Sequence, residues 1–177
     1  MIKINKIINF IFIFTLVLFS MQLESCEKDN INGEVVVDPK LLSKIYSEST
    51  DTLLFQSNYY VLETELYRDF FPSGGSYPKK RRPLIASIYL VNIDSLPIST
   101  DLEIKKLYVI NNQQIWIAAL SNRVQTDVPN YKLGKLNSNG PEWDTNIYVD
   151  VVLEIKNVLT TEIYFLIARD KYIIRVE

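Results

Sequence analysis

Two glutamates at alternate positions are the first residues whose spacing suits chemistry. Glu63 and Glu65 lie in a segment of period two, so on a strand their carboxylates would share one face, roughly 6–7 Å apart along the strand. Glycosidases use carboxylate pairs at comparable distances. The same alternation is typical of a solvent-facing strand, which we favour because catalysis also needs a pocket that separates the two pKa values.

A second set of oxygen-bearing side chains alternates later in the chain. Glu142, Asp144 and Asn146 stand at positions i, i+2 and i+4, and such oxygens are the ligands that Ca²⁺ prefers. The glycine and the distant bidentate glutamate of a calcium loop are missing, and Trp143 between the ligands indicates packing. We therefore expect no metal site, with calcium at these three residues as the alternative to a plain loop.

The loop at residues 72–82 is the longest unusual segment, and it is basic. One interpretation is a contact with an anion or an acidic glycan, in which a tyrosine stacks and cations bind; the other is a solvated loop whose charges protect a sheet edge. Ser76 and Lys79 also match the spacing of a serine-lysine nucleophile, but Pro78 breaks the helical turn that would join them. The predicted ligand-binding residues are Tyr77, Lys79, Lys80, Arg81 and Arg82.

Composition excludes several classes of chemistry. The 177-residue chain has no histidine and one cysteine, which excludes Ser-His-Asp and Cys-His catalysis, imidazole-bound metals and an intramolecular disulfide. No glycine-rich nucleotide loop and no GxSxG elbow is present, so we expect no cofactor. The formal charge of -2 and a pI near 5.3 argue against nucleic acid as a partner.

The N-terminus has the organisation of an export signal. Lys3 and Lys6 precede an apolar run over residues 7–19, which has the length of a signal-peptide core and is too short to span a bilayer comfortably. We therefore assign residues 1–25 to a signal peptide. An uncleaved anchor is the alternative that this short run disfavours.

The end of this segment, Leu23-Glu24-Ser25-Cys26, resembles the lipobox of bacterial lipoproteins. In that family a small residue precedes a cysteine that is lipidated and becomes the new N-terminus, which implies lipidation of Cys26. Glu24 departs from the family pattern, where the middle positions are usually small and uncharged. The alternative is a plain secretory signal that leaves Cys26 free.

Residues 26–30 add a possible sorting address. The sequence Cys-Glu-Lys-Asp-Asn resembles the Lys/Asp/Glu cluster that follows the lipidated cysteine in surface-exported lipoproteins of some Gram-negative bacteria. The resemblance implies an outer-membrane protein that faces the cell surface. We assign residues 26–33 to a flexible tether. The alternative is that this polar stretch is only a hydrated tether with no sorting role, and that the protein faces the periplasm.

The remainder, residues 34–177, predicts one domain built mainly of strands. The last two segments with alternating apolar residues are Ile163–Ile167 and Tyr172–Val176. The residues between them, Arg169-Asp170-Lys171, predict a turn or bulge. Asn111-Asn112 predicts a hairpin turn. The other predicted strands cover Tyr60–Phe71, Leu84–Ile93, Leu102–Ile110, Ile115–Ala119 and Asn146–Lys156.

One short helix is expected over residues 39–48. Asp38 can cap it, Pro39 suits the first helical position, and the apolar residues that follow fall on one stripe. We therefore predict an all-β fold, an antiparallel β-sandwich of immunoglobulin-like or transthyretin-like type, with a closed barrel as the rival.

The expected function is a non-catalytic binding or assembly role for a lipid-anchored envelope lipoprotein. Its partners would be the membrane, through the lipid, and an envelope protein or a glycan. The alternative is a glycan- or anion-binding module that uses the 72–82 loop, and a hydrolase comes third. Two further stretches, Leu66–Phe70 and Gly140–Trp143, combine charged and aromatic residues, but match no pattern with a known activity.

Overall fold

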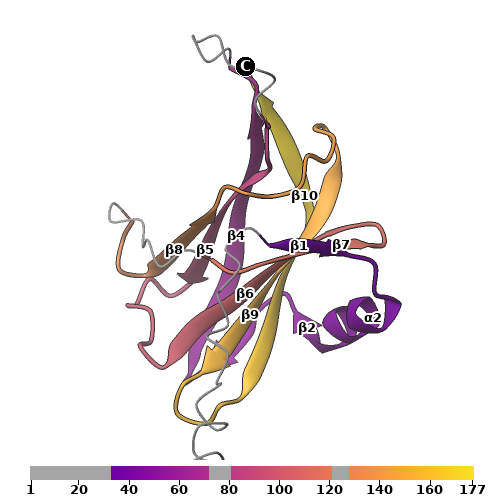
Figure 1. Cartoon of the computed structure of the whole chain (residues 1–177). Coiled ribbons are helices and arrows are strands. Elements are labelled where there is room, and N and C mark those ends of the chain that lie inside the picture. The colour runs from indigo at the N-terminus through magenta and orange to yellow at the C-terminus, as the bar shows by residue number, and fades with distance from the viewer. Residues whose placement is uncertain (1–32, 72–80, 121–127) are drawn as a thin grey trace, which may run out of the picture.

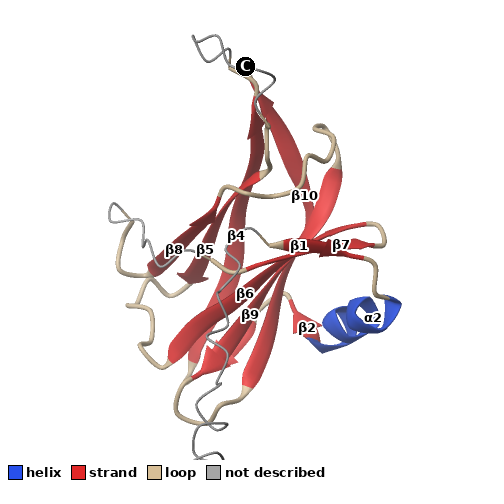
Figure 2. Ribbon diagram, viewed as in Figure 1, coloured by secondary structure: helices blue, strands red, loops and turns tan. Residues whose placement is uncertain are grey.

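The fold consists of strands and one short helix (Figures 1 and 2). It is a computed structural model that describes residues 33–71, 81–120 and 128–177. The elements in these ranges are β1 (Glu34–Val36), α2 (Pro39–Glu48), β2 (Ser49–Thr50), β3 (Leu53–Phe55), β4 (Asn58–Asp69), β5 (Ile85–Asn92), β6 (Leu102–Asn111), β7 (Gln114–Ala118), β8 (Lys132–Asn137), β9 (Tyr148–Asn157) and β10 (Ile163–Val176). The predicted all-β class and the predicted helix are confirmed.

All these strands belong to one curled, mixed sheet that forms a half-barrel. Its order is β1-β7-β6-β9-β10-β4-β5-β8, with β2 pairing to β10 and β3 to β4. The prediction of an antiparallel sheet is wrong at two of the described pairs, since β10 runs parallel to both β4 and β2. Strands so far apart along the chain are joined by no hairpin, so nothing local imposes the antiparallel direction.

A bulge in β10 joins the two halves of this sheet. Ala168 pairs with Val151 and Lys171 with Val149, so two residues, Arg169 and Asp170, lie opposite one. The predicted bulge is therefore confirmed. Because the bulge adds one residue, it reverses which positions of β10 face inward: Leu166 and Ala168 belong to the core before it, and Ile173 belongs to the core after it. The strand passes from β2 to β4 at this point.

The other local predictions are also confirmed. The Asp38 carboxylate accepts hydrogen bonds from the backbone N–H groups of Lys40 and Leu41, at 2.9 and 3.0 Å, and so caps α2. The hairpin between β6 and β7 turns at Asn112, whose φ of 55° is one that asparagine tolerates.

Two apolar clusters hold the fold together. The larger one fills the inside of the curl, where inner faces of both halves meet; it includes Leu62, Leu66, Ile88, Leu107, Trp116, Val151 and Leu166. The smaller one lies on the outer face of the half formed by β6, β7, β9 and the first part of β10, where α2 covers it; it includes Ile45, Tyr108, Ile115, Val152 and Phe165. The helix thus covers only one half of the outer face.

Four strands were not predicted: β1, β2, β3 and β8. The first three have two or three residues each, too few to show a period. In β8 the two leucines, Leu133 and Leu136, are three positions apart and so point to opposite faces of the sheet. Leu133 pairs with the inward-facing Leu90, and Leu136 pairs with the outward-facing Ser87. The strand therefore has no face with alternating apolar residues that its sequence could show.

Tyr46 ties α2 to the bulge and makes stability depend on pH. Its hydroxyl donates to Asp150 Oδ2 at 2.8 Å, while Asp150 Oδ1 accepts from the Asp170 N–H at 2.9 Å. Burial, helped by the hydrogen bond to Asp150, raises the pKa of Tyr46 to about 12. The folded state therefore holds this proton more tightly than the unfolded state, and the resulting stability is present below pH 10 and lost as the pH rises toward 12.

We expect Tyr46→Phe to lower the free energy of unfolding by about 1 kcal/mol at pH 8, because one hydrogen bond at a half-buried site is lost. The difference between wild type and variant should shrink from pH 10 to pH 11.5. Urea denaturation at several pH values measures both effects. Tyr59→Phe, at an exposed tyrosine of β4, is the control. A difference that stays constant over this pH range would contradict the role of the Tyr46 proton.

Candidate functional site

A groove of about 430 Å³ lies across β4, β5 and the segment leading into β8. We call it the Tyr89 groove. In the sheet, Glu63 of β4 pairs with Tyr89 of β5, which in turn pairs with Gly134 of β8. Gly134 is buried and carries no side chain, so the strand position next to Tyr89 adds no side chain to the groove. The groove is lined by Glu63, Thr64, Glu65, Tyr89, Val128, Pro129, Tyr131 and Lys132.

The charged groups of the Tyr89 groove are two carboxylates and one ammonium, and the ammonium pairs with one of the carboxylates. Lys132 Nζ lies 2.6 Å from Glu63 Oε2 and 5.9 Å from the centroid of the Tyr89 ring. The hydrogen bond to Glu63 raises the pKa of Lys132. Within the described part of the chain, Glu65 has no ion-pair partner, so the groove carries one net negative charge.

The predicted shared face of Glu63 and Glu65 is confirmed, since both are exposed on the outer side of β4. A glycosidase pair needs one carboxyl in an apolar site as proton donor. Here both carboxylates contact solvent, and Lys132 neutralises one of them. The geometry therefore favours ligand binding over acid–base catalysis at this pair.

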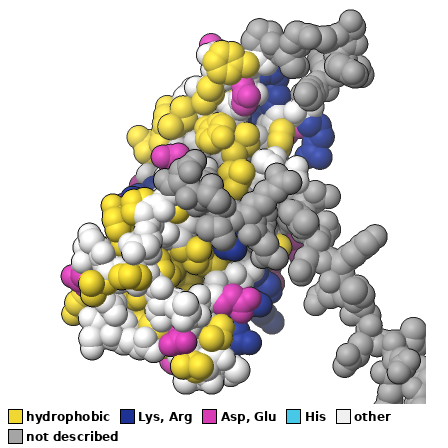
Figure 3. All heavy atoms as spheres, turned by 90° about the vertical axis from the view of Figure 1, so that its left-hand side faces the viewer, with side chains coloured by type: hydrophobic (Ala, Val, Ile, Leu, Met, Phe, Trp, Pro, Cys, Tyr) yellow, Lys and Arg dark blue, Asp and Glu magenta, His cyan; other side chains and the backbone are white. Residues whose placement is uncertain are grey.

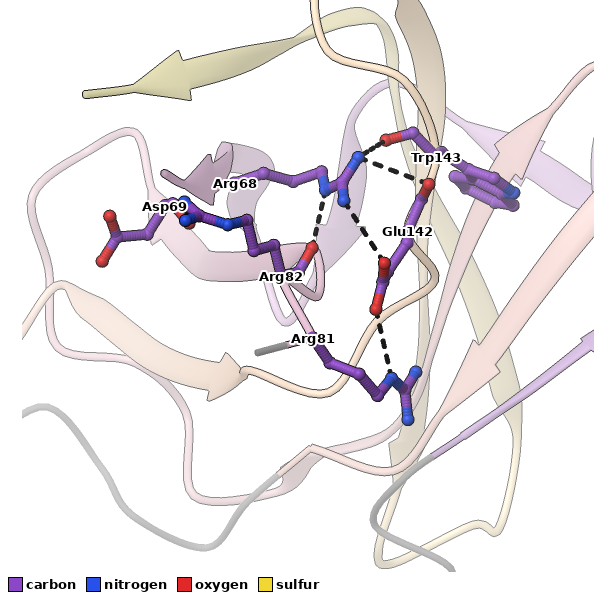
Figure 4. A network of polar contacts seen from close by, with 6 residues as sticks. All are labelled: Arg68, Asp69, Arg81, Arg82, Glu142 and Trp143. Atoms are coloured by element: carbon purple, nitrogen blue, oxygen red, sulfur yellow. Dashed lines mark hydrogen bonds and ion pairs between the residues drawn. The ribbon is translucent and has the colours of Figure 1, made fainter. Parts of the chain in front are cut away.

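A second polar cluster surrounds Arg68 near the end of β4 (Figure 4). Its side chain is only 10% exposed and lies on the inward face. It donates hydrogen bonds to the backbone carbonyls of Arg82 at 2.7 Å, Trp143 at 2.5 Å and Glu142 at 3.3 Å. The Glu142 carboxylate lies 3.8 Å from the same guanidinium. Arg68 thus joins the two stretches, Leu66–Phe70 and Gly140–Trp143, that the sequence left without a role.

Phe70 lies beside this cluster, and its ring makes cation–π contacts with three guanidinium groups. The Cζ atoms of Arg68, Arg82 and Arg175 lie 5.1, 5.0 and 4.1 Å from the centroid of its ring. Arg82 also donates to the Asp69 carbonyl at 3.3 Å. Stacking and hydrogen bonding therefore fix Arg82 against the end of the sheet.

The predicted anion-binding loop is only partly placed by the structure. Tyr77, Lys79 and Lys80 lie outside the described residues. Arg81 is largely exposed, and its Nε lies 3.2 Å from Glu142 Oε1 (Figure 4). Since Arg81 is paired and Arg82 is stacked, both described members of the predicted set have partners within the chain.

The three residues of the alternative calcium site also have different surroundings from a calcium loop. The Glu142 carboxylate lies between two guanidinium groups, those of Arg68 and Arg81. Asn146 Oδ1 accepts a hydrogen bond from the Tyr172 hydroxyl at 2.9 Å, while Asp144 is exposed. Over residues 33–71, 81–120 and 128–177, no group of three or more His, Cys, Asp or Glu side chains is arranged to hold a metal ion.

A third feature is an apolar strip on the outer face beyond the bulge of β10. Tyr148 and Tyr172 pair across β9 and β10, with ring centroids 5.1 Å apart. Ile174 follows on the same side of β10 and pairs with Tyr67 of β4, which pairs with Ile85 of β5. We call these five residues the tyrosine face. The parallel pairing of β10 with β4, which places Ile174 beside Tyr67, has no local signal in the sequence.

Other functional residues were found only by the structure. Arg68 lies on the same inward face of β4 as Leu62 and Leu66. An arginine that continues this apolar face was the signal in the sequence that could have identified it. Lys132 was not singled out because β8 itself was not predicted. Trp116 is fully buried and Trp143 is half-buried against the core.

The signal peptide, Cys26 and the Lys/Asp/Glu cluster lie outside the described residues, so the lipoprotein assignment stays a prediction. In the part of the chain that the structure covers, no helix has both the length and the apolar character needed to cross a membrane. The chain matches no protein-family model, no curated protein and no solved structure in the comparisons made.

Proposed function

We propose that this protein is a lipid-anchored, non-catalytic binding or assembly protein of the bacterial outer membrane. In this role the tyrosine face holds an envelope protein partner. The anchor is supported by the lipobox-like sequence that ends at Cys26. The binding role is supported by the tyrosine face, and this is the observation that carries the proposal.

The tyrosine face has the composition of a protein interface. Tyr148, Tyr172 and Ile174 are 65%, 42% and 50% exposed although they lie in regular strands. Tyrosine is enriched in protein interfaces because its ring offers apolar area and its hydroxyl a polar contact. Exposed neighbouring apolar side chains of this size are a common mark of such surfaces.

The contrast with the other half of the sheet points the same way. Before the bulge, the outer face of β9 and β10 carries Val152, Phe165 and Ile167, and α2 packs on these residues. Beyond the bulge, no described helix or strand covers the tyrosine face (Figure 1). An uncovered apolar strip beside a covered one is suited to a partner that supplies its own apolar surface.

The curl of the sheet brings the inner faces of its two halves together. We further propose that the two halves of the sheet act as the layers of an immunoglobulin-like or transthyretin-like sandwich. The shared core between their inner faces supports this arrangement.

The anchor is tested by fractionation. We expect Cys26→Ala to release the protein from the membrane fraction, because a lipid chain on Cys26 would be the attachment. Glu24→Ala, which restores a small residue to the lipobox-like sequence, should keep it membrane-bound. A Cys26→Ala variant that partitions like wild type would overturn the anchor. Protease treatment of intact cells then separates the surface-exposed orientation from the periplasm-facing one.

The tyrosine face is tested by crosslinking in native membranes, with Tyr148→Ser/Ile174→Ser compared with wild type. We expect wild type to capture one protein in stoichiometric amount and the variant to lose most of it. Leu54→Ser/Leu159→Ser, which changes exposed apolar residues elsewhere, is the matched control and should retain the partner. Equal capture by all three proteins, or no stoichiometric capture by wild type, would contradict the proposal.

A further inference from the structure

The Tyr89 groove offers a set of groups that no part of the proposed function uses. We propose that it binds a saccharide built of neutral or amino-substituted hexose units. The site consists of Glu63, Glu65, Tyr89, Tyr131 and Lys132. It shares no residue with the tyrosine face, so this proposal does not rest on the partner-binding role.

The chemistry of the groove matches the two surfaces of a sugar ring. A hexopyranose has an apolar face of C–H groups and an edge of hydroxyls that both donate and accept hydrogen bonds. Tyr89 and Tyr131 supply aromatic surface for the face. Glu63 and Glu65 supply acceptors for the edge, and Lys132 supplies a donor. At about 430 Å³ the groove falls in the size range of small-ligand sites.

The sheet register places these groups at useful spacings. Glu63 and Tyr89 are direct neighbours on adjacent strands, about 5 Å apart. Glu65 follows two residues along the same strand, so the two carboxylates can contact hydroxyls at opposite ends of one ring. Gly134, which pairs with Tyr89 on the other side, carries no side chain that could contact the Tyr89 ring.

The wall formed by residues 129–132 is held in place before any ligand arrives. The Tyr131 carbonyl accepts from the Asn92 N–H at 2.9 Å, and the Asn130 carbonyl accepts from the Ile98 N–H at 3.0 Å. The Lys132 N–H donates to the Pro129 carbonyl at 2.9 Å and closes the turn. A fixed wall lowers the entropy that binding costs.

The charge of the groove selects between classes of saccharide. Two carboxylates and one ammonium leave one negative charge, carried by Glu65, which disfavours acidic sugars and favours neutral or amino sugars. On the side of the molecule where β5 and β8 lie, acidic side chains are interspersed with hydrophobic ones, and most of the Lys and Arg in view lie toward one edge (Figure 3).

The test uses the full-length mature protein in detergent on an array of immobilised oligosaccharides. The array carries neutral hexoses (glucose, galactose and mannose), amino sugars (glucosamine and N-acetylglucosamine) and hexuronates. We expect binding to at least one neutral or amino oligosaccharide and weaker binding to hexuronates. Calorimetry with the best-bound oligosaccharide should then show a loss of at least tenfold in affinity for Glu65→Gln and for Tyr131→Ala.

Glu103→Gln is the matched control, because Glu103 is an exposed glutamate on β6, far from this groove in the sheet order, with a lysine partner of its own. It should bind the oligosaccharide like wild type. Glu65→Gln changes an exposed side chain and keeps its shape, so its effect cannot come from unfolding. The proposal is overturned if folded wild type binds no neutral or amino oligosaccharide, if hexuronates bind best, or if the groove variants bind like wild type. These outcomes leave the tyrosine face unaffected.

Discussion

Arg68→Ala is expected to lower the free energy of unfolding by about 3–5 kcal/mol. The substitution removes a buried guanidinium that donates to three backbone carbonyls, those of Arg82, Glu142 and Trp143. These segments lie far from Arg68 along the chain, and none of the three bonds can be replaced by a shorter side chain. Carbonyls left without donors in a part-buried site carry the full cost of their desolvation.

Urea denaturation with a matched set of arginine variants measures this effect. Arg68→Lys keeps the charge but loses the planar fork, so it should recover only part of the loss. Arg81→Ala removes the other guanidinium bound to Glu142, but that pair is solvent-exposed, and the change should stay within about 0.5 kcal/mol of wild type. If Arg68→Ala were as stable as Arg81→Ala, the carbonyl network would have no structural role.

Trp116→Ala is expected to lower the free energy of unfolding by a similar amount, about 3–5 kcal/mol. Trp116 is 1% exposed and belongs to the larger apolar cluster inside the curl. A Cβ atom built on Gly33 would lie 2.4 Å from its Nε1, and one built on Gly140 would lie 2.9 Å from its Cη2. The indole therefore fills the space between the segment leading into β1 and the segment that hydrogen-bonds to Leu84.

Trp143→Ala is the matched control for this prediction. Trp143 is only half-buried at the edge of the same core, so its removal should cost less, about 1–2 kcal/mol. Trp116→Phe keeps an aromatic ring but leaves part of the space empty, and should fall between the alanine variant and wild type. Denaturation midpoints in urea give the order of the three variants. An order in which Trp143→Ala is the most destabilised would show that the closure of the curl does not depend on Trp116.

Local periodicity in the sequence was sufficient for the elements that one stretch of chain specifies. The alternation in β4, the cap at Asp38, the turn at Asn112 and the bulge at Asp170 were each predicted from a few consecutive residues. In each case the physical cause is local: side chains alternate on a strand, a carboxylate caps nearby N–H groups, and Asn or Asp tolerates positive φ. The shared face of Glu63 and Glu65 follows from the same alternation.

Tertiary structure alone decided which of these local elements meet. The parallel pairing of β10 with β4 aligns Ile174 with Tyr67, and the closure of the curl brings Glu142 and Trp143 to Arg68. The Tyr89 groove likewise needs β8, whose apolar residues do not alternate, beside β5. Pairing between distant strands depends on the packing of the whole core, which no short window of sequence contains. The sequence by itself therefore determined the strands and the residues on their faces, whereas the groove, the tyrosine face and the arginine network exist only once the sheet has curled.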